Sequence, residues 1–174
     1  GYSLYLISGK LGFHLATGNG SMTCSPNPSS SCTNYGETYF VADGQWHHLA
    51  VTMKRDDPAG GKFYVDGNVV GSFNPTNRTA SLTNDGALRL GSRSFSPPTG
   101  FYNGILDEVE LFPRVLTTAE IQGIFRAGSN GKCKTCVPPP PEMALWLPLD
   151  ETSGTTAADI AGFPTNGTHV NGPI

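Results

Sequence analysis

Apolar and polar residues alternate most clearly along residues 46–54. Successive side chains of a strand point to opposite faces, so one face would carry the apolar residues Leu49, Val51 and Met53. The other face would carry His48, Ala50, Thr52 and Lys54. The pattern predicts a strand with one buried face and one wetter face, as in a layer of an antiparallel sheet.

A second extended segment begins at Phe63, after a charged loop rich in Pro and Gly at residues 55–61. Asp66 and Gly67 come next and predict a tight turn, because Gly tolerates a positive φ. The chain is therefore expected to fold back on itself as a β-hairpin after this second segment.

Short apolar segments elsewhere predict further strands. They lie at residues 2–7, 11–16, 87–91 and 105–112. One helix is expected near residues 118–127. Thr117 would be its N-cap and Glu120 would complete a capping box, while Gly128 would end the helix.

The order of these motifs resembles the laminin-G-like, concanavalin-A-like superfamily. The resemblance is carried by D-G-Q-W-H-H-L-A-V-T, F-Y-V-D-G, L-R-L-G and G-I-L-D-E-V-E-L-F, and it covers roughly residues 1–128. It implies an all-β fold, an antiparallel jelly-roll β-sandwich with one short helix near residues 118–127. Because one fold hosts many functions, the resemblance implies the fold and leaves the activity open.

The composition suits such a sandwich and argues against two classes of function. The chain has 174 residues with 22 Gly and 14 Pro, as expected for short strands separated by turns. Charged residues make up only 14% and the net charge is -3, which argues against electrostatic binding of nucleic acid. No run of about 18 apolar residues occurs, so no membrane insertion is expected.

A run of four prolines divides the chain. Residues 1–131 would form a laminin-G-like sandwich that is N-terminally incomplete, because the family usually has more sheet before the first strand. Residues 132–141 would form a Cys/Pro-rich linker. Residues 142–174 resemble the first strands of a following laminin-G-like repeat. Alternatively, they complete the sandwich in cis, or in trans through residues 143–149 of a neighbouring copy.

The four cysteines occur as two close pairs. Cys24 and Cys32 enclose a polar, turn-forming segment and predict a disulfide-closed loop, with two free thiols as the alternative. Cys133 and Cys136 form a C-x-x-C without the βαβ context of a redox site, which favours a small structural disulfide. Disulfides suit an oxidising compartment, so an extracellular or cell-surface location is expected.

Three sites match the short N-glycosylation pattern. They begin at Asn19, Asn77 and Asn166. Because the pattern is short and this chain is rich in Asn, Gly, Ser and Thr, these asparagines are candidates for modification only.

Asp107 is the most informative polar residue, because alternation places it on the apolar face of the strand expected at residues 105–112. An unpaired buried charge is costly, so this carboxylate needs a partner. Backbone amides or an arginine would serve, and so would Ca²⁺, which takes oxygen ligands. Asp107 and Asp159 are therefore the candidate metal ligands, and Ca²⁺ is the candidate cofactor.

Two other groups of residues invite a functional interpretation. His47 and His48 would point to opposite faces of a strand and could not bind one ion, and the resemblance implies that they pack. Phe95, Phe101 and Tyr102 lie in a loop, where they would stack on a sugar in a lectin or would simply cap the end of the sandwich.

Some concanavalin-like folds are glycoside hydrolases, and retaining chemistry needs two carboxyl groups about 5–5.5 Å apart. Glu108 and Glu110 would share a face of a strand. However, the E-x-D-x-(x)-E pattern of those hydrolases is absent, and no Ser/His/Asp or Cys/His set occurs in a useful context. The sequence therefore predicts no enzyme activity.

These features predict a non-catalytic extracellular laminin-G-like repeat module. It would serve adhesion, carbohydrate binding or the assembly of a cell-surface fibre by strand exchange between subunits. Its partners would be a glycan or matrix component, or another copy bound through residues 143–149. The alternative is an accessory carbohydrate-binding module of a secreted glycoside hydrolase. Binding of glycans would be lost in Phe101 or Tyr102 variants if that loop carried the site.

Overall fold

The computed structural model describes residues 1–17, 32–93, 99–128, 142–161 and 165–168. The chain divides into two compact units. Unit 1 contains Gly1–Asn84 and Val115–Lys132, and unit 2 contains Asp85–Arg114 and Cys133–Ile174. The described residues are mostly antiparallel strands with one short helix, which confirms the predicted all-β fold class. No helix in these ranges has the length and apolarity needed to cross a membrane.

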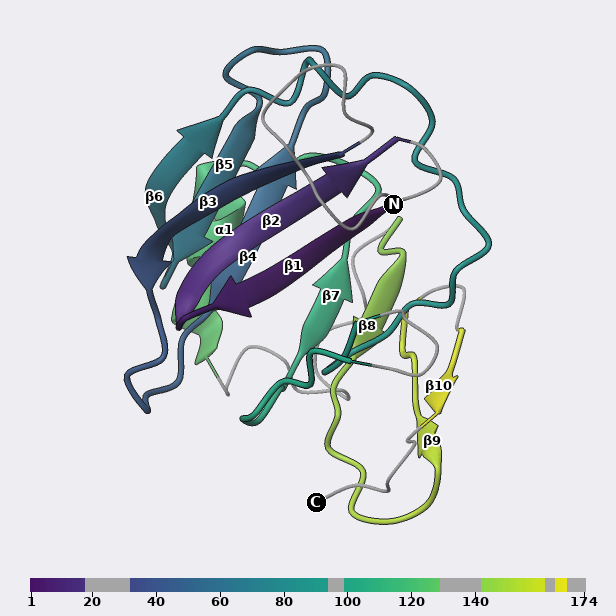
Figure 1. The fold of residues 1–174 in the computed structure, drawn as a ribbon. Helices are drawn as coiled ribbons and strands as arrows, with labels where there is room; N and C mark the ends of the chain where they lie inside the picture. Colours follow the sequence, from purple (N-terminus) through teal and green to yellow (C-terminus); the bar gives the residue numbers. More distant parts are fainter. Residues whose placement is uncertain (18–31, 94–98, 129–141, 162–164, 169–174) are drawn as a thin grey trace. The chain divides into compact units, whose positions relative to one another are not determined.

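Unit 1 contains two three-stranded antiparallel sheets that lie face to face (Figure 1). The first sheet has the order β1-β2-β3, with β1 at Tyr2–Ile7, β2 at Lys10–Ala16 and β3 at Cys32–Phe40. The second has the order β4-β5-β6, with β4 at Leu49–Met53, β5 at Gly61–Val65 and β6 at Asn68–Phe73. Strand β3 was not predicted from the sequence, whereas β1, β2, β4 and β5 confirm predicted strands.

The core of unit 1 lies between the central strands of its two sheets. Every second residue of β2 is apolar and buried, and these side chains pack with Phe63 of β5. The buried cluster consists of Leu11, Phe13, Leu15 and Phe63. The predicted inner face of β4 packs against it through Leu49, Val51 and Met53, which confirms the alternation read from the sequence.

Two-residue turns set the register of both sheets in unit 1. Ser8 and Gly9 join β1 to β2 with φ of 49° and 74°, and Asp66 and Gly67 join β5 to β6 with φ of 53° and 75°. Two successive positive φ angles are the signature of a type I′ turn, whose twist matches that of the flanking strands. The turn predicted at Asp66 and Gly67 is confirmed.

Helix α1, Thr118–Ala127, begins at the N-cap Thr117 and has the predicted capping box. The Thr117 hydroxyl accepts the backbone N–H of Glu120, and the Glu120 carboxylate accepts the backbone N–H of Thr117. Ile121 is the buried residue of the helix. Gly128 follows the helix with a φ of 50°, which favours glycine.

Two predictions about strands are wrong, one in unit 1 and one in unit 2. The strand predicted from Trp46 begins only at Leu49, and Trp46 is 66% exposed. The strand predicted at residues 87–91 does not form, and Leu88 is 58% exposed there. A short alternating segment becomes a strand only when a neighbouring strand pairs with it, and this segment has no such pairing among the described residues.

Unit 2 contains two short strand pairs. Strand β7, Val109–Leu111, pairs antiparallel with β8, Leu145–Leu147, and β9, Thr156–Ala157, pairs with β10, Gly167–Thr168. All three residues of β8 are buried. The segment 143–149 therefore pairs within its own chain with part of the strand expected at 105–112. The predicted domain boundaries at residues 131 and 142 stay a prediction.

Candidate functional site

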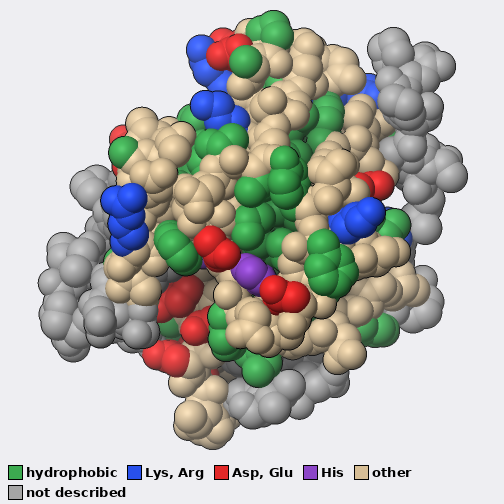
Figure 2. All heavy atoms as spheres, turned by 90° about the vertical axis from the view of Figure 1, so that its left-hand side faces the viewer, with side chains coloured by type: hydrophobic (Ala, Val, Ile, Leu, Met, Phe, Trp, Pro, Cys, Tyr) green, Lys and Arg blue, Asp and Glu red, His purple; other side chains and the backbone are tan. Residues whose placement is uncertain are grey.

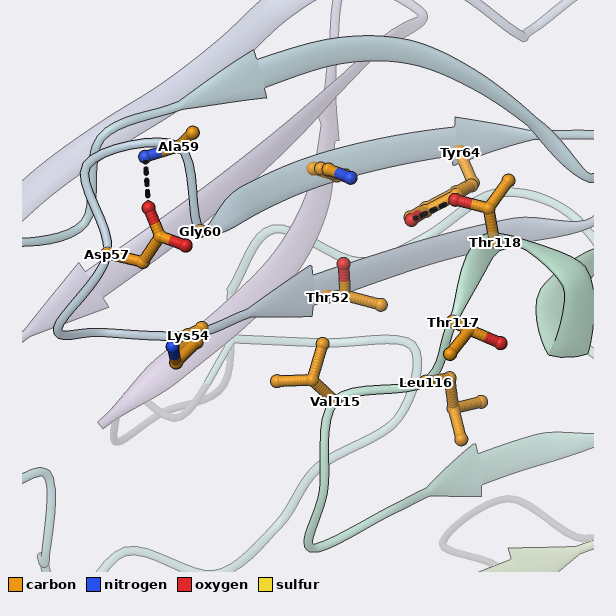
Figure 3. A pocket seen from close by; sticks show the side chains of 11 residues that line it. Thr52, Lys54, Asp57, Ala59, Gly60, Tyr64, Val115, Leu116, Thr117 and Thr118 are labelled. Carbon is orange, nitrogen blue, oxygen red and sulfur yellow. Dashed lines mark hydrogen bonds between the residues drawn. The ribbon is translucent and has the colours of Figure 1, made fainter.

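A pocket of about 340 Å³ lies in unit 1, on the face of β4 and β5 that points away from the apolar core (Figure 3). We call it the β4–β5 pocket. Thr52 and Lys62 are directly opposite each other in the ladder, so their side chains share a face. Tyr64 lies two residues further along β5 and shares that face, and Lys54 directly follows the end of β4 at Met53 and also lines the pocket. Strand alternation thus brings three of these four polar side chains together.

The other walls of the pocket come from a loop and from the start of α1. Its remaining lining residues are Asp57, Ala59, Gly60, Val115, Leu116, Thr117 and Thr118. The loop is closed by its own hydrogen bonds: Ala59 N donates to Asp57 Oδ1 over 2.9 Å, and Gly60 N donates to the Asp57 carbonyl oxygen over 2.9 Å. The wall therefore has a defined shape before any ligand binds.

Two hydroxyl-bearing residues of the pocket lining are buried. Tyr64 is 1% exposed, and its hydroxyl lies 3.3 Å from Thr118 Oγ1. Thr52 is 8% exposed, points toward the pocket in Figure 3, and makes no side-chain hydrogen bond among the described residues. On this face, which was expected to be wetter, Lys54 is exposed, whereas Thr52 is buried beside the segment leading into α1. The Thr52 oxygen is not enclosed by protein, so its hydroxyl is open to the pocket and available to a ligand.

The pocket lining carries two ammonium groups and one carboxylate. Lys62 is half-buried and forms no ion pair among the described residues. Lys54 Nζ lies 3.9 Å from Asp56 Oδ1, and both of these side chains are mostly exposed. Asp57 is the one acidic residue of the lining. These groups can donate hydrogen bonds to a ligand and attract a negative charge.

A second polar cluster in unit 1 surrounds His47. Its Nδ1 lies 2.8 Å from Asp66 Oδ2, and its Nε2 lies 3.1 Å from Asp43 Oδ1. Both ring nitrogens can donate only in the imidazolium form. Hydrogen bonds to Asp66 and then to Asp43 raise the pKa of His47, against a smaller opposing effect of burial. In Figure 2 a histidine side chain lies at the surface with acidic side chains on either side.

The neighbouring His48 has a different environment. Its ring lies 6.1 Å from the ring of Phe125 in α1, and its backbone N–H donates to Asp66 Oδ1. The two imidazole rings therefore have different neighbours, although Asp66 contacts both residues. Neither histidine lies in β4, so the predicted alternation on a strand does not apply to them. Among the described residues, no group of three or more His, Cys, Asp or Glu side chains is arranged to hold a metal ion. The calcium assignment stays a prediction.

Asp159 lies buried in unit 2, where its carboxylate accepts three backbone N–H groups. Trp146 N and Ala161 N donate to Oδ1 over 3.0 and 2.9 Å, and Thr165 N donates to Oδ2 over 2.8 Å. Burial alone would raise the pKa of Asp159, but the three hydrogen bonds outweigh it and hold the pKa below its ordinary value. These three backbone contacts supply the partners that the buried Asp159 carboxylate needs.

The placement expected for Asp107 is wrong. Strand β7 begins at Val109, and Glu108 before it has a φ of 52°, which breaks the alternation. Asp107 is consequently exposed and does not lie on an apolar face. Glu108 instead accepts the indole N–H of Trp146 at Oε2 over 2.6 Å. The two glutamates, Glu108 and Glu110, do not form the evenly spaced pair that a regular strand would give.

The other predicted site residues are scattered. Phe101 is 71% exposed and Tyr102 is also exposed, both in unit 2. Asn77 and Asn166 are exposed, and Cys32 is buried and disulfide-bonded. Five candidates lie outside the described residues: Asn19, Cys24, Phe95, Cys133 and Cys136. The pairing of the cysteines, the use of the sequons and the role of the aromatic loop all stay predictions.

Sequence reasoning missed the β4–β5 pocket, although a signal was present. The polar residues Thr52 and Lys54 recur at a spacing of two, and Lys62 and Tyr64 do the same on the next strand. Their common face could be predicted from the hairpin. The cover provided by Val115–Thr118 could not, because these residues lie about 50 positions further along the chain.

Comparisons with known proteins identify the family of this chain. No match was found among the curated proteins. One solved structure, an S-layer domain-containing protein (residues 221–444) from Clostridium thermocellum, has 23% sequence identity and a TM-score of 0.34. The match covers 67% of this chain and 52% of that structure, so the chain spans about half of its length. Residues 1–122 match the laminin-G family described as the concanavalin A-like lectin/glucanases superfamily. The chain therefore belongs to the concanavalin A-like lectin/glucanases superfamily.

Proposed function

We propose that this chain is a non-catalytic extracellular module that binds carbohydrate in the β4–β5 pocket. The observation that carries the proposal is the Thr52 hydroxyl, which makes no side-chain hydrogen bond among the described residues and faces a pocket lined by further hydroxyl and ammonium groups. Sugars offer many hydroxyl groups, which both donate and accept hydrogen bonds. The volume of about 340 Å³ lies at the small end of ligand sites, which span roughly 300–1,000 Å³.

The acidic residues of the pocket support a binding role over hydrolysis. Glycoside hydrolysis uses a pair of carboxyl groups that flank the scissile bond. The β4–β5 pocket has one carboxylate, Asp57, and one of its oxygens already accepts the backbone N–H of Ala59. In unit 2, Glu108 is bound to the Trp146 indole. Neither place offers two facing carboxylates.

An extracellular location is supported by family membership and by the disulfide-bonded Cys32, because disulfides persist in oxidising compartments. Such a module would serve adhesion or would anchor a larger protein to a glycan surface. As an accessory module of a secreted glycoside hydrolase it would bind carbohydrate in the same pocket. The difference lies in the rest of the protein, so both roles share one binding test.

The test is binding of a panel of soluble oligosaccharides, measured by calorimetry on the 174-residue chain. Thr52→Val keeps the shape of the side chain and removes the hydroxyl. We expect the variant to lose about 3- to 10-fold in affinity, as one hydrogen bond is worth about 0.5–1.5 kcal/mol. Thr83→Val is the matched control, because Thr83 is exposed and does not line the pocket. Equal affinity in the wild type and Thr52→Val would contradict the proposal.

A second function, assembly by strand exchange, is favoured by the pairing of β8 with β7. The ladder joins Val109 to Leu147 and Leu111 to Leu145, and all three β8 residues are buried. The same ladder formed between two copies would link them into a chain of subunits. In this role residues 143–149 would bind a neighbouring copy.

Strand exchange is tested by mixing two single variants, Val109→Cys and Leu147→Cys, which are direct cross-strand partners. Exchange would give a covalent heterodimer when the oxidised mixture is resolved on a gel without reductant. Light scattering of the wild-type chain would then show a mass that grows with concentration. A monomer at every concentration, with no heterodimer in the mixture, would contradict assembly and leave the pairing within one chain.

A further inference from the structure

We infer that the β4–β5 pocket takes an acidic saccharide, a sugar ring bearing a carboxylate or a sulfate, with the anion held by Lys62 and Lys54. The inference rests on the proposed carbohydrate binding and names the ligand class at that site. The chain as a whole has a net charge of -3, whereas the pocket lining has two ammonium groups and one carboxylate. Asp56 Oδ1 lies 3.9 Å from Lys54 Nζ, so Lys62 is the lining lysine whose charge is not paired among the described residues. An unpaired, half-buried ammonium group favours an anionic ligand.

Lys62 carries most of this argument, because no neighbouring strand compensates its charge. It lies in the central strand β5, opposite Thr52 on β4 and Ser72 on β6. Opposite charges are the favourable cross-strand partners of a lysine, yet both of its partners are neutral. Lys62 is also half-buried and forms no ion pair among the described residues. A ligand anion would supply the missing countercharge.

Lys54 can join Lys62 at little cost. Its contact with Asp56 spans 3.9 Å, and the two side chains are 59% and 81% exposed. Exposed pairs of this kind contribute little to stability, so the ammonium can turn toward a ligand. The opposing carboxylate of Asp57 is partly occupied by the N–H of Ala59.

Hydroxyl groups complete the anion site. Thr52 is more than nine-tenths buried, has no side-chain hydrogen bond among the described residues and points toward the pocket (Figure 3). A hydroxyl that donates to a charged oxygen makes a shorter and stronger bond than one that donates to a neutral oxygen. The N-terminus of α1 adds little, because the Glu120 carboxylate already accepts from Thr117 there. The inference therefore depends on the lysines and Thr52.

The absence of an aromatic platform in the lining favours an acidic ligand over a neutral one. Neutral sugars commonly stack on an exposed aromatic ring, and all lining residues of the pocket belong to the described part of the chain. Tyr64 is the one aromatic residue among them, and at 1% exposure its ring is covered. Recognition must then come from polar and charged groups.

The experiment is calorimetric titration of the full chain with three trisaccharides of one linkage: galacturonic acid, its neutral galactose counterpart and the 6-O-sulfated galactose form. We expect at least one acidic form to bind 10-fold or more tightly than the neutral form at low salt. This advantage should shrink as salt is added, because screening weakens exposed charge interactions. The acidic form that binds more tightly identifies the anion as carboxylate or sulfate.

Lysine substitutions test whether the preference for the acidic sugar arises in the β4–β5 pocket. Lys62→Gln should lower the affinity for the acidic form at least 10-fold and change the affinity for the neutral form by less than 2-fold. Lys54→Gln should have a smaller effect of the same kind. Lys10→Gln is the matched control, because Lys10 is an exposed lysine on β2 and does not line the pocket. Thermal unfolding of each variant excludes misfolding as the cause of lost binding.

The outcomes separate this inference from the proposed function. If neutral and acidic forms bind equally and Lys62→Gln binds like wild type, the acidic specificity is overturned while carbohydrate binding stands. If none of the three sugars binds, carbohydrate binding in this pocket fails and the inference fails with it. If an oligoglutamate peptide binds in a Lys62-dependent way and the sugars do not, the site is an anion site for peptides, which overturns the saccharide class.

Discussion

Units 1 and 2 of this chain bury apolar residues in different ways. Unit 1 has strands of up to nine residues, and alternation along them places an apolar face between two sheets. Unit 2 has strands of two or three residues, which are too short to present such a face. Its apolar clusters are accompanied by buried polar anchors. The comparison suggests that polar contacts fix the structure where strand pairing is short.

Trp146 shows how the anchors work in unit 2. Its backbone N–H donates to Asp159, and its indole N–H donates to Glu108. The side chain packs with Met143 and Ala161. One residue of β8 is thus fixed by two carboxylates and one apolar cluster.

Unit 1 also has a buried polar anchor, because the Arg78 guanidinium donates to Thr33 Oγ1 and to the Cys32 carbonyl oxygen, both over 2.9 Å. There the anchor adds to a large apolar core, whereas the contacts of His47 lie at the edge of the sheets.

The largest expected effect is on the core of unit 1. Phe63 packs between Leu11, Phe13 and Leu15, and its ring lies 5.1 Å from that of Phe73. Phe63→Ala should lower the free energy of unfolding by about 3–5 kcal/mol, because it removes buried apolar area and leaves a cavity. Urea denaturation followed by circular dichroism measures the loss. Phe63→Leu keeps most of the volume and should cost less than about 1.5 kcal/mol.

The next effect tests whether a polar anchor in unit 2 matters as much as a core residue. Asp159→Ala leaves three backbone N–H groups without their acceptor and should destabilise by about 2–4 kcal/mol. Asp159→Asn keeps one acceptor oxygen and should cost less. The unfolding of unit 2 can be followed by Trp146 fluorescence in a Trp46→Phe background. A loss below about 0.5 kcal/mol in Asp159→Ala would contradict the view that unit 2 depends on this polar anchor.

The pH dependence of this anchor has a definite sign. The pKa of Asp159 is lowered in the folded state, so its carboxylate contributes stability above the ordinary value of 3.8. That contribution is lost as the pH falls through the lowered pKa. As the pH falls below 3.8, the free energy of unfolding should therefore decrease more steeply in the wild type than in Asp159→Asn, whose amide does not titrate. Urea denaturation followed by Trp146 fluorescence at several acidic pH values measures both slopes.

A smaller effect isolates one anchor bond. Trp146→Phe keeps an aromatic ring and removes the indole N–H that donates to Glu108. We expect a loss of about 1.5–3 kcal/mol, the range for hydrogen bonds to charged groups. Trp46→Phe is the matched control, because Trp46 is mostly exposed and surface substitutions usually stay within about 0.5 kcal/mol. Similar losses in both variants, measured by urea denaturation, would contradict an anchoring role for the indole.

The two units also differ in how much of them the sequence predicts. In unit 1 the information is local: the hairpin at Asp66 and Gly67, the alternation of β4 and the capping box of α1 each lie within a few residues. In unit 2 the decisive contacts join distant residues. The positive φ of Glu108 ends the expected alternation, and its carboxylate binds Trp146 far along the chain. No short pattern specifies that bond.

The β4–β5 pocket lies between these two cases. Its floor follows from local alternation, which places Thr52 and Lys62 on one face. Its cover follows from the packing of the segment Val115–Thr118, which no local pattern specifies. The sequence could therefore predict a polar face and could not predict that Thr52 on this face is buried. The sequence also directed attention to Asp107 and Phe101, which are exposed in the structure.

The smallest effect concerns the polar cluster at the edge of unit 1. Hydrogen bonds to Asp66 and Asp43 raise the pKa of His47, so the imidazolium contributes stability that is complete below the ordinary value of 6.5. That stability is lost as the pH rises through the raised pKa. Because the side chains are partly exposed, we expect about 0.5 kcal/mol. His47→Gln should therefore lower the thermal stability at pH about 5.5 and have little effect at pH about 9.

His14→Gln is the matched control for this measurement, because the His14 ring lies 2.9 Å from the neutral side-chain amide of Asn34. The difference between wild type and His47→Gln should shrink as the pH rises, whereas the difference for His14→Gln should change less. A His47→Gln difference that is constant with pH would mean that the ring acts through packing. A loss above about 2 kcal/mol would show that unit 1, like unit 2, depends on a polar anchor, because exposed ion pairs are worth less than this.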